Sequence, residues 1–177
     1  VGHDVCIPHD ISFDARFPRL ITLGGGILIG GGSTLKAHTL KKTGKGIQLT
    51  IGKVELKERT MCGGMAILLP GSVINKHSML NLYATLDTAT GEGELWAGTP
   101  AKNIHTFSPE EIEKYFKPAT KDKEEQKKYY AEFRQKVDAF IKNPSQTYLK
   151  IYYNGSRAGP GNDWFRARNV FRIFFNG

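Results

Sequence analysis

The sequence predicts a mainly β protein built as a solenoid of short parallel strands, and three observations carry this prediction. Residues 56–91 divide into six consecutive blocks of six residues, and an apolar residue of middling size opens each block. The fifth position of the first five blocks is always alanine or a small hydroxyl residue. Helices repeat apolar residues at steps of three and four and strands at steps of two, so a period of six with two constrained columns is typical of a solenoid.

The same six-residue frame fits two earlier runs, residues 1–18 and residues 23–40, which brings the total to twelve blocks. If one block is a strand with a tight corner, three blocks form one coil and twelve form four coils, each about 4.8 Å above the last. The first column of side chains is expected to fill a narrow interior: Val1, Ile7, Phe13, Leu23, Ile29, Leu35, Leu56, Cys62, Leu68, Ile74, Leu80 and Leu86.

Glycine follows the first-column residue in several blocks, where backbone crowding or a positive φ favours it. The glycine runs at 24–26 and 30–32 keep the six-residue register and no GK[ST] follows them, which favours solenoid corners over a phosphate-binding loop. Asn75 and Asn81 stand where glycine is expected, and we predict a positive φ at both. His77 is expected at a surface corner.

Composition places the chain among globular proteins of one domain, with room for an appendage. It has 177 residues, 40% of them hydrophobic and 24% charged. We expect no membrane span and a cytoplasmic location, because no long apolar run or basic leader occurs. Only Cys6 and Cys62 are present, which argues against a disulfide framework and against cysteine-based metal sites. The net charge of +8 is compatible with binding to nucleic acid, to an anionic surface or to a phosphate-bearing substrate.

Four features together resemble one known family. They are the blocks themselves, the GKVEL stretch at 52–56, the LLPG at 68–71 and the closing WAGTPAKNI at 96–104. Over residues 1–106 the chain resembles the hexapeptide-repeat acyltransferases, in particular the galactoside and maltose O-acetyltransferase branch. The resemblance implies a left-handed parallel β-helix, a homotrimer, acetyl-CoA as co-substrate without a metal, and acetyl transfer to a hydroxyl or amine of a small acceptor, expected to be a sugar.

Two interruptions of the repeat, at residues 17–22 and 41–55, predict the binding side, because loops that leave a solenoid usually build its binding face. His38 precedes the longer one, and an imidazole can act as a base at neutral pH. The resemblance implies that His38 is the general base; a solvent-facing or structural histidine is the alternative. Asp14 is implied to face acceptor hydroxyls or to orient His38, with a surface ion pair to Arg16 as the alternative.

The resemblance also implies that acetyl-CoA lies in a groove between two subunits. It assigns contacts to the backbone of two residues and to four further positions: Gly64, Leu82, Asp87, Thr88, Lys102 and His105. The family commonly has Thr-Lys where this chain has Asp87-Thr88, and the GEGE segment at 91–94 adds negative charge. An inactive β-helix that serves as a scaffold is therefore an alternative to the enzyme.

The remainder of the chain has a different character, and we divide it into helices over residues 107–144 and a tail over residues 145–177. Ser108 opens a capping box that predicts a short helix through about Phe116, and an amphipathic helix is expected from about 121 to 142. The tail alternates aromatic and basic residues. This pattern is typical of a segment that packs on a helix or a subunit, or of a patch that binds nucleic acid or a lipid surface. We do not expect nucleic acid to be the main partner.

Overall fold

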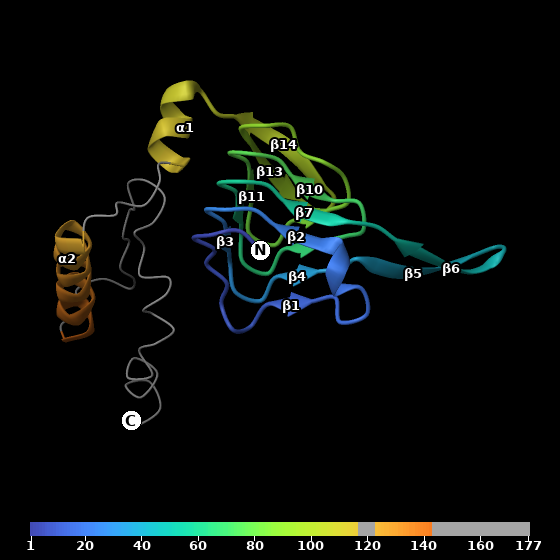
Figure 1. The fold of residues 1–177 in the computed structure, drawn as a ribbon, viewed down its shortest axis with the longest axis horizontal. Helices are drawn as coiled ribbons and strands as arrows, with labels where there is room; N and C mark the ends of the chain where they lie inside the picture. Colours follow the sequence, from blue (N-terminus) through green and yellow to red (C-terminus); the bar gives the residue numbers. More distant parts are fainter. Residues whose placement is uncertain (117–122, 143–177) are drawn as a thin grey trace. The chain divides into compact units, whose positions relative to one another are not determined.

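A computed structural model describes residues 1–116 and 123–142 of the chain (Figure 1). The chain divides into two compact units, Val1–Phe116 and Lys117–Gly177. The first unit contains all the described strands and the helix α1 (Pro109–Phe116), so α1 belongs with the β-structure that precedes it. The second contains the described helix α2 (Lys123–Lys142), close to the predicted bounds, while the aromatic and basic tail at 145–177 lies outside the described residues.

The first unit is a parallel β-helix whose strands form three faces. Face A consists of β3 (Leu28–Ile29), β8 (Met61–Cys62), β11 (Met79–Leu80) and β13 (Glu94–Gly98), and β14 (Ala101–Thr106) pairs antiparallel with β13. Face B consists of β1 (Ser12–Phe13), β4 (Thr34–Leu35), β9 (Ile67–Leu68) and β12 (Thr85–Leu86). Face C consists of β2 (Ile21–Leu23), β7 (Val54–Leu56) and β10 (Val73–Ile74). The predicted solenoid of parallel strands is therefore confirmed.

The predicted interior column is buried throughout the second and third runs of blocks. Three residues of face A illustrate the register: Ile29 lies beside Cys62, and Cys62 beside Leu80, each pair in parallel strands. The small fifth column is buried as well, and its hydroxyl groups bond to the corner backbone. Ser72 Oγ donates to the carbonyl of Leu69 at 2.7 Å, for example. A larger side chain would have no room there, and it would remove the hydroxyl's bond to that carbonyl, which would keep the bond from the Ser72 amide at 3.0 Å.

The first run follows the predicted register but not the predicted burial. Phe13 pairs with Leu35 on face B, and Cys6 bridges to Leu28 on face A, so each residue is aligned with the coil above it. Val1, Ile7 and Phe13 are nevertheless exposed, and the prediction that they fill the interior is wrong. These residues belong to the first coil, and no described strand covers its other side.

The corners correct our interpretation of glycine and asparagine. A Cβ at Gly30 would lie 2.3 Å from the amide nitrogen of Gly64, so crowding between stacked corners explains this glycine. Positive φ occurs two residues after Asn75 and Asn81, at His77 (56°) and Tyr83 (58°), and not at the asparagines themselves. His77 is also not a fully exposed surface residue: its side chain is half-buried and packs against Phe116 of α1, with ring centroids 5.5 Å apart.

One connection between faces B and C is a long insertion and not a tight corner. Between β4 and β7 the chain forms an antiparallel hairpin of β5 (His38–Thr43) and β6 (Gly46–Ile51), which projects away from the coils (Figure 1). In the coil below, the same corner holds residues 14–20, including a short 3₁₀ helix at Pro18–Leu20. Both interruptions predicted from the sequence thus leave at the corner between faces B and C.

The helix α1 begins as the sequence predicts. The Ser108 amide donates to Glu111 Oε2 at 2.9 Å and the Glu111 amide donates to Ser108 Oγ at 3.3 Å, which is a reciprocal capping box. Its last residue, Phe116, is buried and packs edge-on against Phe107.

Candidate functional site

The corner between faces B and C holds a buried carboxylate. The side chain of Asp14 has no exposed surface, and both of its oxygens are fully engaged. Oδ1 accepts the amides of Arg16 and Phe17 at 2.9 and 3.0 Å, while Oδ2 accepts the amides of Ala37 and His38 at 2.9 and 3.0 Å. One carboxylate therefore ties the corner of the first coil to the corner of the second.

The same carboxylate holds the imidazole of His38. The distance from His38 Nδ1 to Asp14 Oδ2 is 2.5 Å. Burial by itself raises the pKa of Asp14, but the hydrogen bonds from the Phe17 amide, the His38 ring and the Arg16 amide outweigh it and lower the pKa to about 2. Asp14 is thus ionised at neutral pH and can only accept, so Nδ1 carries the proton of the neutral imidazole and Nε2 carries the lone pair.

His38 remains accessible although its partner is not. A quarter of its side-chain surface is exposed, compared with none for Asp14. The ring of Phe17 packs edge-on against the imidazole at 5.4 Å between centroids. Among the described residues, Nε2 has no hydrogen-bond partner. An imidazole in this state can accept a proton from a molecule that approaches the corner.

Sequence reasoning treated the hairpin as a loop and missed its pattern. His38 pairs with Ile51, Leu40 with Leu49, and Lys42 with Ile47. Side chains alternate between the two faces of a strand, so these six residues share one face of the hairpin with the imidazole. The alternation of apolar and polar residues from Ile47 to Ile51, after the glycines of the turn, is a signal that could have revealed it.

The residues that the resemblance assigns to the donor lie at several places. Gly64 and Leu82 are neighbours at the corner between faces A and B, where a Cβ on Gly64 would lie 3.5 Å from the Leu82 side chain. Asp87 and Thr88 follow β12 and are exposed at the corner between faces B and C. The structure thus places the first pair at the opposite edge of face B from His38.

The backbone of the first pair is partly engaged. The Leu82 amide donates to its neighbour Asn81 at 2.8 Å, and the Gly64 carbonyl accepts the Tyr83 amide at 3.0 Å. Within the described part of the chain, this leaves the Gly64 amide and the Leu82 carbonyl without hydrogen bonds. One donor and one acceptor are what an amide of a bound ligand requires.

The last two predicted contacts lie on β14. Lys102 is exposed and pairs with Ala97 of β13. His105 is also exposed, and its Nε2 lies 2.9 Å from Glu111 of α1. The Ser108 amide and the His105 ring lower the pKa of Glu111, so this carboxylate stays ionised beside the histidine. His105 is therefore paired within the chain.

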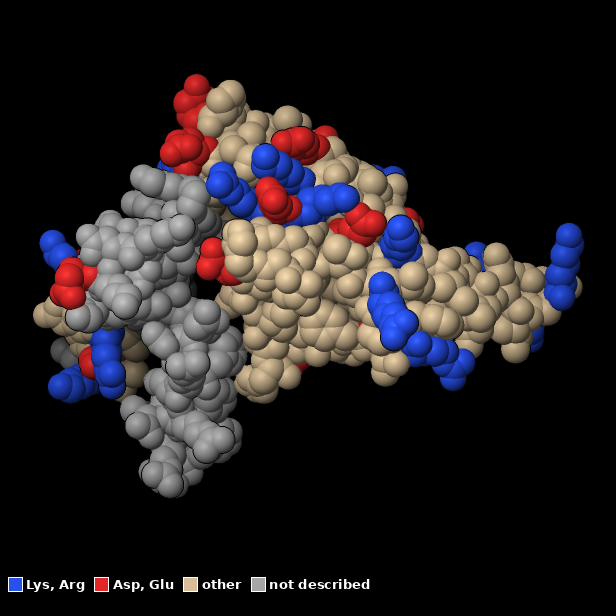
Figure 2. Space-filling view, in the orientation of Figure 1, with Lys and Arg blue, Asp and Glu red and all other residues tan. Residues whose placement is uncertain are grey.

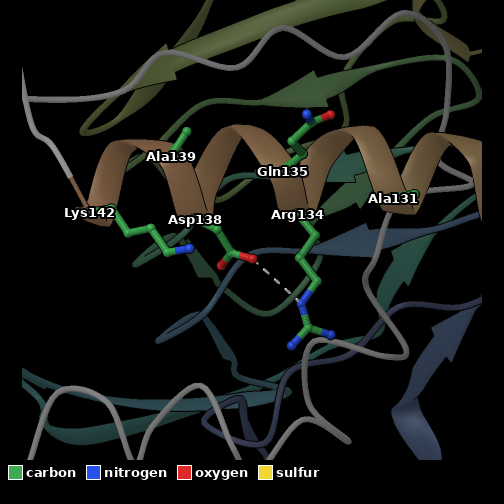
Figure 3. A pocket seen from close by; sticks show the side chains of 6 residues that line it. All are labelled: Ala131, Arg134, Gln135, Asp138, Ala139 and Lys142. Carbon is green, nitrogen blue, oxygen red and sulfur yellow. Dashed lines mark ion pairs between the residues drawn. The ribbon is translucent and has the colours of Figure 1, made fainter.

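Elsewhere in the described residues, three observations bear on possible sites. A hollow on α2 is lined by side chains of that helix alone, with Arg134 and Asp138 forming an ion pair at 3.9 Å (Figure 3). No group of three or more His, Cys, Asp or Glu in residues 1–116 or 123–142 is arranged to hold a metal ion. Neither described helix has the length and apolar character needed to cross a bilayer.

No family model matches the chain. Its sequence is 35% identical over 106 residues to delta-poly-L-ornithine synthetase of Acinetobacter baumannii, and the match includes 59% of this chain. The chain spans only 7% of the length of that curated relative.

The β-helix of this chain is also similar to several solved structures. A galactoside acetyltransferase in complex with coenzyme A matches with a TM-score of 0.54 at 15% identity, over 68% of this chain and 71% of that one. A hexapeptide-repeat acetyltransferase of Vibrio cholerae matches with a TM-score of 0.52 at 14% identity, over 61% and 73%. A maltose O-acetyltransferase of Clostridium difficile matches with a TM-score of 0.50 at 13% identity, over 61% and 69%. The chain has the left-handed β-helix fold of the hexapeptide-repeat acyltransferases.

Proposed function

We propose that this protein transfers an acetyl group from acetyl-CoA to a hydroxyl or amine of a small acceptor, with His38 as the general base. The observation that carries the proposal is the pairing of His38 with Asp14. A buried, ionised carboxylate fixes the tautomer of an accessible imidazole at the corner from which both excursions leave. The fold neighbours with coenzyme A support the choice of donor.

Each residue of the pair has a distinct part in the proposed reaction. Bound acetyl-CoA supplies a thioester whose carbonyl carbon is open to attack by an oxygen or nitrogen. His38 Nε2 takes the proton of the attacking group as the new bond forms, and returns it to the sulfur as the carbon–sulfur bond breaks. Asp14 keeps Nδ1 protonated and stabilises the imidazolium between these two steps.

The proposed donor contacts favour an assembly of several protomers, which we propose to be a homotrimer. Gly64 and Leu82 lie at the opposite edge of face B from His38, so one protomer does not bring a donor held there to its own imidazole. Two protomers side by side can do so. The Gly64 amide and the Leu82 carbonyl suit an amide of the donor's pantetheine arm, and Lys102 suits its phosphates.

The acceptor is proposed to be a sugar, because fold neighbours act on galactosides and maltose. An amine acceptor is the other possibility, since the matching synthetase is named for a polymer of ornithine. A test assay therefore follows release of the CoA thiol with panels of both sugars and amines. Thiol release that depends on an acceptor and disappears in the His38→Ala variant is the expected result.

A scaffold is the second candidate, and two observations favour it. Thr88 stands where the family commonly has a lysine, with the negative charge of Asp87 beside it, and the sequence match is to a small part of a much longer synthetase. Calorimetric titration with acetyl-CoA separates the candidates. An enzyme gives a binding heat that saturates, whereas the absence of binding heat together with the absence of thiol release would favour the scaffold.

A further inference from the structure

The corner that holds His38 contains seven of the eleven lysine and arginine residues in residues 1–106. The two segments that form it, residues 15–20 and 36–53, contain seven basic residues and no acidic one. Figure 2 shows Lys and Arg side chains distributed along the hairpin from its root to its tip. We call these seven exposed residues the cationic cluster: Arg16, Arg19, Lys36, Lys41, Lys42, Lys45 and Lys53.

No ion pair in the described part of the chain neutralises this cluster, although Lys53 lies close enough to Glu55 to help lower the pKa of that carboxylate. The acid at the same corner of these two coils is Asp14, whose oxygens are already occupied by four backbone amides and one imidazole. Lys57, which directly follows β7, by contrast pairs with Glu55 at 2.7 Å. Within the described residues, none of the seven cations forms an ion pair. Like charges kept together without counter-charges repel one another, and a bound anion would relieve that repulsion.

The hairpin places one of these cations in line with the imidazole. His38, Leu40 and Lys42 follow one another on the same face of β5, opposite Ile51, Leu49 and Ile47 of β6. Four residues of strand put the Cα atoms of His38 and Lys42 roughly 13 Å apart. The residues between them are apolar and exposed, Leu40 by 67%. A molecule lying along this face meets the base, an apolar stretch and then a positive charge.

The position of the cluster along the stack assigns it to the acceptor. The cluster belongs to the first two coils, whereas Lys102, the cation proposed for the donor phosphates, is on β14 beyond the last strand of face A. At about 4.8 Å per coil, three coils of rise separate the two regions by roughly 14 Å. We propose that the acceptor of this enzyme is phosphorylated, and that the cationic cluster binds its phosphate while His38 deprotonates its hydroxyl or amine. This inference rests on the proposed function.

Matched acceptors test the proposal. Acetyl transfer is measured with glucose against glucose 6-phosphate and with glucosamine against glucosamine 6-phosphate, at saturating acetyl-CoA. We expect kcat/KM for the phosphorylated member to be at least tenfold higher, which corresponds to about 1.4 kcal/mol. The preference should shrink when salt rises from about 0.05 M to about 0.5 M, because salt screens exposed charges. Equal kcat/KM values within both pairs would overturn the proposal and leave the acetyltransferase standing.

Charge removal distinguishes the acceptor's phosphate from those of the donor. In an Arg16→Gln, Lys42→Gln double variant the preference for the phosphorylated acceptor should fall about tenfold. The matched control, Lys57→Gln with Lys76→Gln, removes two cations outside the cluster and should keep the preference. If the double variant instead raises the KM for acetyl-CoA without changing the preference, the cluster holds the donor and the proposal is wrong.

A binding measurement does not depend on turnover. Titration of the full chain with glucose 6-phosphate should shift the NMR resonances of the His38 imidazole at concentrations where glucose does not, and the double variant should lose that difference. Identical titrations with the two sugars would count against the phosphate site. Absence of both acetyl-CoA binding and thiol release, with the glucose 6-phosphate shift still present, would instead refute the proposed function.

Discussion

Two corners of the same β-helix each carry a histidine near a carboxylate, yet they differ in almost every other respect. At the corner between faces C and A, the chain turns within four residues per coil and repeatedly adopts a positive φ, as at Arg59 (54°) and Gly93 (68°). Its His77 is 14% exposed and 4.0 Å from Glu92, and its buried Nε2 has no hydrogen-bond partner among the described residues. At the corner between faces B and C, His38 is more exposed and its carboxylate is 2.5 Å away.

The difference shows what an insertion provides. In a corner of four residues the backbone forms only the turn itself. Its side chains therefore either point outwards or are covered by a neighbouring element, as Phe116 covers His77. The insertions at the other corner bring together backbone amides from two coils, which is enough to stabilise a fully buried carboxylate. With those amides in place, the fold keeps an ionised aspartate out of water while its histidine stays in contact with water.

The largest expected effect comes from removing the accessible imidazole. His38→Ala should lower kcat for acetyl transfer by about 10²–10⁴-fold, the usual contribution of a general base, with little change in acetyl-CoA affinity. The matched control is His3→Ala, which removes an exposed histidine from the corner between faces C and A. A His38 variant with wild-type turnover would show that the two corners do not differ in chemistry.

Removing the charge of the buried carboxylate should be the next largest effect. Asp14→Asn places an amide where both oxygens accept N–H groups, so the variant should unfold at lower denaturant concentration at pH 7. The pKa of Asp14 is lowered to about 2 from 3.8, so its contribution is present above about pH 4 and disappears as the pH falls towards 2. Denaturant curves of the wild type and the variant should therefore converge over that range.

Asp87→Asn provides the control for this measurement, because it removes the charge of an exposed aspartate at the same kind of corner. Its denaturant curve should overlie that of the wild type at every pH. Parallel curves for Asp14→Asn from pH 7 to pH 2 would mean that the carboxylate does not stabilise the corner through its ionised form.

A smaller effect tests the tight corner. Arg59 is exposed and has a φ of 54°, which costs a residue with a Cβ about 1–2 kcal/mol. Arg59→Gly should relieve this and raise the free energy of unfolding by about 0.5–1 kcal/mol after the entropy of glycine is taken into account. Glu58→Gly, one residue earlier and without a positive φ, should lower it by a similar amount. If both variants lose stability, backbone strain does not shape this corner.

The smallest effect concerns the covered histidine. Burial lowers the pKa of His77 from 6.5, and the nearby charges of Lys76 and Arg59 lower it further, against the opposing effects of Glu92 and Glu58. The unfolded chain thus binds a proton that the folded chain does not, and stability should fall as the pH drops below about 6.5. His77→Gln should make this part of the stability–pH profile shallower. An unchanged profile would show that His77 does not take up a proton when the chain unfolds.

Much of the fold follows from the sequence because a β-helix repeats one local rule. Each interior position faces similar neighbours above and below, so the six-residue column at Leu68 and Leu80 predicts their burial directly. The rule fails where neighbours are missing, as at Phe13, and where another element covers a corner, as at His77. Those environments depend on contacts between distant segments, and a local period carries no information about them.

The candidate site was predictable only in part. His38 stands out because it precedes an interruption of the repeat, whereas nothing in the sequence near Asp14 indicates that four backbone amides converge on it. Asp14 and His38 are 24 residues apart, and their pairing depends on one coil stacking on the next. The hairpin shows the same limit: the alternation from Ile47 to Ile51 reveals a strand, but its partner and register become evident only in three dimensions.

The antiparallel return of β14 has a consequence for how molecules of this kind meet. A stack of parallel strands presents a ladder at its end that a second stack could continue, and unlimited growth of this sort produces fibres. Beside β13, that ladder is occupied by a strand of the opposite direction whose side chains are mostly exposed and include Lys102. Face A therefore ends on an antiparallel strand with an exposed lysine, a feature that disfavours continuation of the ladder by a second copy.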